Sequence, residues 1–166
     1  GTLEKDVVLK AAEALKAELE TRADYQVVLV RDDDNFITLK DRVRAGRAAK
    51  ADLFISLHAD SVSDASVHGA SVYTLSETAS DSVAAELERS ENAADIISGV
   101  DLSGNDEVGT ILIDLAQRET KNRSSTFAQL LLPQLERQTG LISKPHRFAG
   151  FRVLKAPDVP SVLIEL

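Results

Sequence analysis

The hydrophobic positions in the first third of the chain follow two periodicities. Over Leu3–Thr21 apolar residues recur every four positions, which predicts an amphipathic helix, and Thr2 is suited to cap its first turn. The apolar runs Tyr25–Arg31 and Leu53–His58 instead predict two buried strands, the second of them central in its sheet. Between them, Leu39–Lys50 has the apolar stripe of a helix. The order strand, helix, strand predicts a βαβ unit.

Three further strands are predicted later in the chain, at Gly69–Thr74, Phe151–Leu154 and Ser161–Leu166. Strands that alternate with helices favour a parallel sheet, because each crossover helix returns the chain to the same edge. We therefore predict a single α/β domain over residues 1–166. Its mostly parallel sheet is flanked by helices on both faces, and a helical segment is inserted into it.

The predicted helices of the second half surround a loop. Thr78–Ile97 contains neither glycine nor proline and is compatible with a helix, whereas Ser98–Asp106 contains two glycines and is predicted to be a loop. Glu107–Thr139 is again mostly helical. Pro133 should kink or interrupt this helix, and Gly140 is a suitable residue to end it.

Charge is concentrated in one part of the chain. The sequence has 166 residues, no cysteine and a net charge of −8. Between Glu77 and Glu107 nine residues are acidic and only Arg89 is basic, so that this segment carries the whole net charge. A neutral body with one acidic stretch argues against nucleic-acid binding, which needs a basic surface. No run of about 18 apolar residues is present, so no membrane span is expected.

Two residues at predicted strand ends are candidates for chemistry. His58 ends the apolar run Leu53–His58, at the edge where α/β proteins bind ligands, although hydrogen bonds alone could satisfy a histidine there. Glu165 interrupts an apolar strand and needs a partner such as a metal ion or an arginine, unless its strand is an edge strand with Glu165 facing water. Glu4, in the first turn of a helix, would be unremarkable alone.

The remaining candidates have simpler interpretations. His68 and His146 lie in regions predicted to be loops, and we expect both to be surface residues. The run Asp32–Asp34 could bind Mg²⁺, but a polar turn explains it as well. A helix-start glutamate, a strand-end histidine and a strand-end glutamate could together form a zinc hydrolase site.

Six separate strings, which together span nearly the whole chain, carry a family resemblance. In order they are Glu4–Leu9, Arg31–Arg42, Ala51–Ser61, Gly69–Tyr73, Ala149–Ala156 and Val159–Glu165. They resemble the zinc-dependent N-acetylmuramoyl-L-alanine amidases, which hydrolyse the amide bond between N-acetylmuramic acid and L-alanine in peptidoglycan.

The resemblance implies a role for three residues. Glu4 and His58 match metal-binding residues of the family, and Glu165 matches its catalytic glutamate. The zinc ion would polarise the amide carbonyl, and Glu165 would move the proton from water to the leaving amine. The family's first metal-binding histidine, in a His-Gly-Gly-type motif, and the segment after the last strand are absent from these residues. We therefore expect the amidase domain to be truncated at both ends.

The acidic segment also resembles a region of this family. In the division-associated periplasmic amidases of Gram-negative bacteria, a helix covers the zinc site until an activator protein displaces it. The resemblance implies that residues 77–124 form such an inserted regulatory segment, that the protein is periplasmic and that an activator protein is its partner. Glu91 is the expected zinc-blocking residue, with Glu88 as the alternative.

Two other functions remain open from the sequence. The chain could be a non-catalytic module that binds peptidoglycan or regulates its hydrolysis, with an incomplete zinc site. It could also be a receiver-like signalling domain, suggested by Asp32–Asp34, although such a domain should begin with a strand and this chain begins with a helix.

Overall fold

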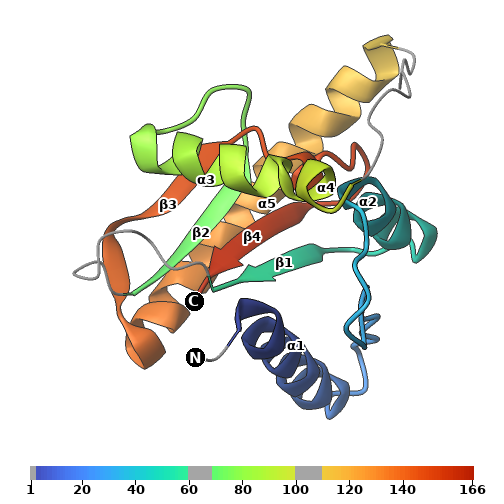
Figure 1. The fold of residues 1–166 in the computed structure, drawn as a ribbon, viewed down its shortest axis with the longest axis vertical. Helices are drawn as coiled ribbons and strands as arrows, with labels where there is room; N and C mark the ends of the chain where they lie inside the picture. The colour runs from blue at the N-terminus through green and yellow to red at the C-terminus, as the bar shows by residue number, and fades with distance from the viewer. Residues whose placement is uncertain (1–2, 60–68, 100–109) are drawn as a thin grey trace.

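The computed structural model describes residues 3–59, 69–99 and 110–166, in which helices and strands form a layered fold (Figure 1). In chain order the elements are α1 (Glu4–Glu20), α2 (Leu39–Ala48), β1 (Phe54–His58), β2 (Ala70–Leu75), α3 (Ser82–Asn92), α4 (Ala94–Ile97), α5 (Thr110–Thr139), β3 (Leu141–Ala149), the 3₁₀ turn η1 (Arg152–Leu154) and β4 (Ser161–Glu165). The predictions for Thr2, His68 and residues 100–106 lie outside the described residues.

The four described strands form one mixed sheet in the order β1-β4-β2-β3. β1 runs parallel to β4 and β2 runs parallel to β3, whereas β2 and β4 are antiparallel. The predicted α/β class, with a mostly parallel sheet, is confirmed. The central position predicted for Leu53–His58 is wrong, because β1 lies at an edge of the described sheet. The strand has apolar residues on both faces because both faces of the sheet are covered: Ile55 packs toward one face and Phe54 toward the other.

Helices cover both faces of this sheet, as Figure 1 shows. On one face α5 places Ala128 against Val72 and Val162, and all three residues are fully buried. On the other face α2, α3 and η1 enclose a second cluster around Tyr73 and Phe151, whose rings meet edge to face at 5.4 Å between centroids. Burial of a residue such as Phe151 stabilises the fold by about 1.5–3 kcal/mol. The sheet is therefore held from both sides, and its strand ends are fixed in position.

The chain between α5 and β4 differs from the prediction. Phe151–Leu154 is not a strand: Arg152–Leu154 forms the 3₁₀ turn η1, which buries both Val153 and Leu154 in the core. The strand β3 lies earlier, and its polar sequence around Pro145 gave no apolar signal. Because β3 is at the edge of the sheet and its register with β2 shifts, a proline without an N–H group is accommodated there.

The strand and βαβ unit predicted from Tyr25–Arg31 are also wrong. This segment pairs with no strand in the described part of the chain, and Tyr25 is 55% exposed. Side chains of α1 bind its backbone instead. Nζ of Lys16 donates to the carbonyl of Val27 at 2.7 Å, and Oε1 of Glu20 accepts from the Val27 N–H at 3.4 Å. The segment therefore follows the surface of α1.

The predicted helices are present with small changes at their ends. Thr78–Ile97 is divided into α3 and α4, and α3 begins where Oδ1 of Asp81 accepts from the Ala84 N–H at 2.9 Å. α5 continues through Pro133 without interruption, because apolar residues on both sides of it pack on the same core cluster. Gly140 ends α5 with a φ of 74°, as expected of a terminal glycine.

Candidate functional site

The two strand-end candidates lie side by side in the sheet. β1 and β4 are parallel, and His58 is the register partner of Glu165, so both residues stand at the carboxyl ends of their strands. β4 lies between β1 and β2, which excludes the alternative that Glu165 is on an edge strand. His58 is 6% exposed, and Oε1 of Glu165 is buried. Two ionisable groups therefore meet at the edge of the sheet where α/β proteins generally bind ligands.

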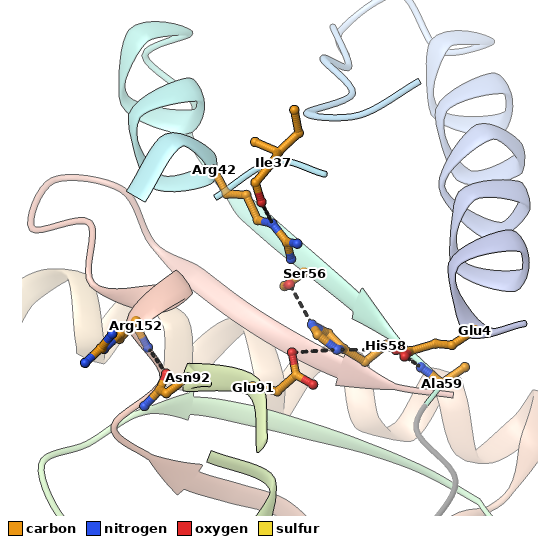
Figure 2. Close-up of polar contacts among 9 residues, drawn as sticks. All are labelled: Glu4, Ile37, Arg42, Ser56, His58, Ala59, Glu91, Asn92 and Arg152. Carbon is orange, nitrogen blue, oxygen red and sulfur yellow. Dashed lines mark hydrogen bonds and ion pairs between the residues drawn. The ribbon is translucent and has the colours of Figure 1, made fainter. Parts of the chain in front are cut away.

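The imidazole of His58 has a different environment at each nitrogen (Figure 2). Nε2 lies 3.0 Å from Oγ of Ser56, two residues earlier in β1. Nδ1 faces two carboxylates, at 3.5 Å from Oε1 of Glu4 and 3.2 Å from Oε2 of Glu91. Side chains from α1, β1 and α3 therefore converge on one ring.

Glu4 is the first residue of α1, and a second contact holds its side chain in this position. The same oxygen, Oε1, accepts a hydrogen bond of 3.1 Å from the backbone N–H of Ala59. That bond joins the start of α1 to the residue that follows β1, although the two are 55 positions apart in the sequence. Position alone did not distinguish Glu4 from any other first-turn glutamate, and only the family resemblance assigned it a role.

Of the two acidic residues considered for α3, the structure brings Glu91 to His58. The Glu91 side chain is 15% exposed. Glu88 lies elsewhere: its Oε1 lies so close to Gly150 that a Cβ added there would come within 2.8 Å of it. The helix therefore presents Glu91 to the strand ends and Glu88 to the segment before η1.

Further contacts hold α3 and α4 over the strand ends. Nδ2 of Asn92 donates to the carbonyl of Gly150 at 3.2 Å, and Oδ1 of Asn92 accepts from the Arg152 N–H at 2.8 Å. Asp95 of α4 is 4% exposed, and its Oδ1 accepts from the N–H of Leu39, the first residue of α2, at 2.9 Å. Sequence reasoning missed Asn92 and Asp95, because their partners are backbone groups more than fifty residues away.

The electrostatics of the site favour a cation at Nδ1 of His58. Burial by itself lowers the pKa of His58, but the hydrogen bonds to Glu4 and Glu91 and the charges of Glu91 and Glu165 raise it to about 10. Burial lowers the pKa of Arg42 in α2, and the charges of Glu91 and Asp95 oppose that shift. Its Nε donates to the carbonyl of Ile37 at 2.9 Å (Figure 2).

The distance from Nδ1 of His58 to each of the two carboxylate oxygens suits a pair of zinc ligands. Two ligands at about 2.1 Å from a tetrahedral zinc ion are about 3.4 Å apart. The distances of 3.5 Å from His58 to Glu4 and 3.2 Å from His58 to Glu91 are close to that value. Imidazole nitrogen and carboxylate oxygen are both zinc ligands. No set of three or more His, Asp or Glu side chains within the described residues has the spacing of a complete metal site.

The other candidates lie away from this site. His146 is in β3 rather than in a loop, and it is half-buried, so the surface-loop prediction is wrong. Its Nε2 lies 3.1 Å from Oγ1 of Thr74, and burial lowers its pKa. The Asp32–Asp34 run is an exposed bend, in which Asp34 forms an ion pair of 2.6 Å with Lys5. These contacts agree with the polar-turn interpretation.

The fold and the site together define an α/β protein with a histidine and several carboxylates at the carboxyl ends of parallel strands. The whole chain, residues 1–166, matches the Amidase_3 family, N-acetylmuramoyl-L-alanine amidase. The chain belongs to this family, as the six strings indicated. No helix among the described residues is both long enough and apolar enough to cross a membrane.

The similarity extends to curated relatives and to solved structures. The chain is 42% identical to AmiC of Neisseria meningitidis serogroup B, over 99% of this chain and 40% of AmiC. It is 38% identical to AmiA of Escherichia coli K12, over 99% of this chain and 57% of AmiA. It therefore spans between two fifths and three fifths of the length of these relatives.

Among solved structures, the catalytic domain of CwlV from Bacillus (Paenibacillus) polymyxa var. colistinus has a TM-score of 0.59 at 23% identity, over 99% of this chain and 66% of that one. AmiC2 of Nostoc punctiforme has a TM-score of 0.58 at 26% identity, over 99% and 67%. These structures share the fold.

Proposed function

We propose that this domain hydrolyses the amide bond between N-acetylmuramic acid and L-alanine in peptidoglycan. The observation that carries the proposal is the convergence of Glu4, His58 and Glu91 beside Glu165, in a chain that belongs to the amidase family. Hydrolysis of this one bond gives both products: the lactyl group becomes a carboxylate, and the stem peptide leaves with a free L-alanine amine.

Glu4 and His58 are the residues that would hold a zinc ion, with Oε1 and Nδ1 as the ligand atoms. When bound there, the ion supplies Lewis-acid chemistry for amide hydrolysis. His58 is fixed by its strand, and Glu4 is fixed by the Ala59 N–H. Both ligand atoms are therefore oriented before any metal arrives, which reduces the cost of ordering them.

Glu165 is suited to be the proton carrier. Its strand places it next to His58, and its carboxylate is partly shielded from bulk water. In the proposed reaction a carboxylate oxygen of Glu165 accepts a proton from the attacking water. The same oxygen then donates the proton to the amine of the leaving L-alanine, so that the residue ends the cycle ionised.

The contacts of α3 support a second element of the proposal, that the described state is autoinhibited. Glu91 lies against the same nitrogen that would bind the metal, and so occupies a position that substrate or water needs. Asn92 and Asp95 hold the helix in place through three backbone groups of the domain. An activator protein that displaced α3 and α4 would break all of these contacts and open the strand ends.

The regulatory segment is proposed to comprise residues 77–124, and its end falls inside α5. The later part of that helix belongs to the domain itself, because Phe127 and Leu131 pack in the core. Since the proposed substrate is the cell-wall polymer, the proposed location is the periplasm.

The main test is a carboxylate deletion in the full-length protein with its inhibitory contact removed. In a Glu91→Ala background, Glu165→Gln should abolish release of stem peptides from purified sacculi, and mass spectrometry should find no new L-alanine amine. Glu119→Gln is the matched control, because Glu119 is an exposed residue of α5 paired with Arg123. Near-normal release by the Glu165 variant contradicts the assignment.

One observation favours a second function, a non-catalytic module that binds peptidoglycan. No complete three-residue metal site is present within the described ranges. Metal analysis of the purified full-length protein separates the two functions. An amidase should contain about one zinc ion per chain and digest sacculi once Glu91 is replaced, whereas a binding module should sediment with sacculi and leave them intact.

A further inference from the structure

Ser56 and His58 lie on the same face of β1, because alternate residues of a strand point to the same side of its sheet. Oγ of Ser56 is 3.0 Å from Nε2 of His58. Ser56 is 8% exposed and His58 is 6% exposed. Water therefore does not compete for this contact, and the ring is held on the side opposite to the carboxylates (Figure 2).

The contact at Nε2 decides what the other ring nitrogen can do. A neutral imidazole carries one N–H and one lone pair, and only the nitrogen with the lone pair binds a metal. Nδ1 of His58 is the nitrogen that faces Glu4 and Glu91, so the ring hydrogen must reside on Nε2 if Nδ1 is to be the ligand. A hydroxyl oxygen beside Nε2 can accept that hydrogen, so the contact is compatible with this tautomer.

We propose that Ser56 is a positioning residue: its Oγ accepts the Nε2 hydrogen of His58 and thereby presents the Nδ1 lone pair toward Glu4. The proposal rests on the metal-binding role proposed for His58. Partners of this kind fix the orientation of metal-binding histidines, and their loss weakens metal affinity by about 10- to 100-fold.

Ser56 differs from two other buried serines, Ser124 and Ser161. The hydroxyl of Ser124 donates to the carbonyl of Thr120 at 2.9 Å, and that of Ser161 donates to the carbonyl of Val159 at 2.8 Å. Oγ of Ser124 also accepts from the Ser161 N–H at 2.9 Å, so both hydroxyls are bonded to backbone groups. Ser56 instead has the imidazole of His58 as its side-chain partner, in a strand interior where a β-branched apolar residue is otherwise favoured.

The test measures zinc affinity of the full-length protein by competition with a chelator. Ser56→Ala should weaken zinc binding by about 10- to 100-fold, and Ser56→Thr, which keeps the hydroxyl, should restore most of it. The matched control is Ser124→Ala, which also removes a buried hydroxyl. This control should lower thermal stability without changing zinc affinity.

A second measurement reports on the ring itself. The tautomer of the His58 ring is read from the spectrum of ¹⁵N-histidine-labelled, zinc-loaded protein. His58 should appear with Nε2 protonated, and its Nε2 hydrogen should exchange faster in Ser56→Ala.

Unchanged zinc affinity in Ser56→Ala overturns the proposal. If the unsubstituted protein binds no zinc, the metal role of His58 fails and the positioning role fails with it. If zinc binds but sacculi are not digested, only the amidase proposal fails, because neither readout depends on activity.

Discussion

The contact between α4 and α2 predicts how firmly the strand ends are covered. Asp95 is almost fully buried, and its carboxylate accepts a hydrogen bond from the N–H of Leu39 at the start of α2. A negative charge at a helix N-terminus is also stabilised by the helix dipole. The perturbation is Asp95→Ala, which removes both the acceptor and the charge from the covered state.

The magnitude follows from the kind of bond that is lost. A hydrogen bond to a charged group contributes about 1.5–3 kcal/mol. When α4 detaches, water satisfies both partners, so this energy is lost only from the covered state. Each 1.4 kcal/mol is a tenfold change in an equilibrium. If the domain is the autoinhibited amidase proposed above, its uncovered fraction and its basal activity should both rise about 10- to 100-fold.

The assay is dye release from labelled sacculi without any activator, accompanied by hydrogen exchange of the α3 and α4 amides. Asp95→Asn keeps an oxygen acceptor but loses the charge, so it should give a smaller rise than Asp95→Ala. Asp158→Asn is the control, because Asp158 is half-exposed and pairs with Arg47 away from the site. If Asp95→Ala leaves both dye release and exchange unchanged, this bond does not hold the cover in place.

Three other predictions follow from the contacts of the site and the sheet. Glu91→Ala should raise basal dye release, whereas Glu88→Ala should not, because only Glu91 touches His58. In metal-free protein the pKa of His58 is raised from 6.5 to about 10, so the stability it contributes is complete below about pH 6.5 and is lost as the pH rises through 10. Melting temperatures measured in chelator should fall over that range, and a flat profile contradicts the assignment. Gly69→Ala should lower the free energy of unfolding, measured by urea denaturation, by more than about 1 kcal/mol. The reason is that the φ of Gly69 is +121° and a Cβ there would lie 2.8 Å from the Leu141 carbonyl carbon. Gly99→Ala is the control and should cost less, because there is open space around Gly99.

The parts of the fold that the sequence predicts are those in which apolar residues have a regular period. β4 and its glutamate were predictable because Glu165 interrupts an apolar run that must lie inside the sheet. β3 was not, because an edge strand tolerates Lys144, Pro145 and other residues that are typical of loops. Tyr25–Arg31 has the composition of a strand but pairs with none in the described part of the chain, and composition does not reveal whether a partner exists.

The residues of the site also divide into those that a sequence pattern locates and those that it does not. His58 and Glu165 could be located from their strands, since a strand end has a known place in an α/β fold. Asn92 and Asp95 could not, because each meets backbone atoms more than fifty residues away. Ser56 was overlooked although it lies two residues from His58. A serine two residues before a strand-end histidine is the one local signal that was available, since strand geometry places both on one face.

The contact between Glu91 and His58 joins two equilibria into one. A cation at Nδ1, whether a proton or a metal ion, is stabilised by the Glu91 carboxylate, and in return it holds α3 against the sheet. A protein that displaced α3 would therefore weaken the binding of that cation. By thermodynamic reciprocity, the cation would weaken the binding of that protein by the same factor. If an activator displaces α3 as proposed, activator and cation are therefore antagonists at this site, and the occupancy of Nδ1 changes the affinity for a partner that does not touch it.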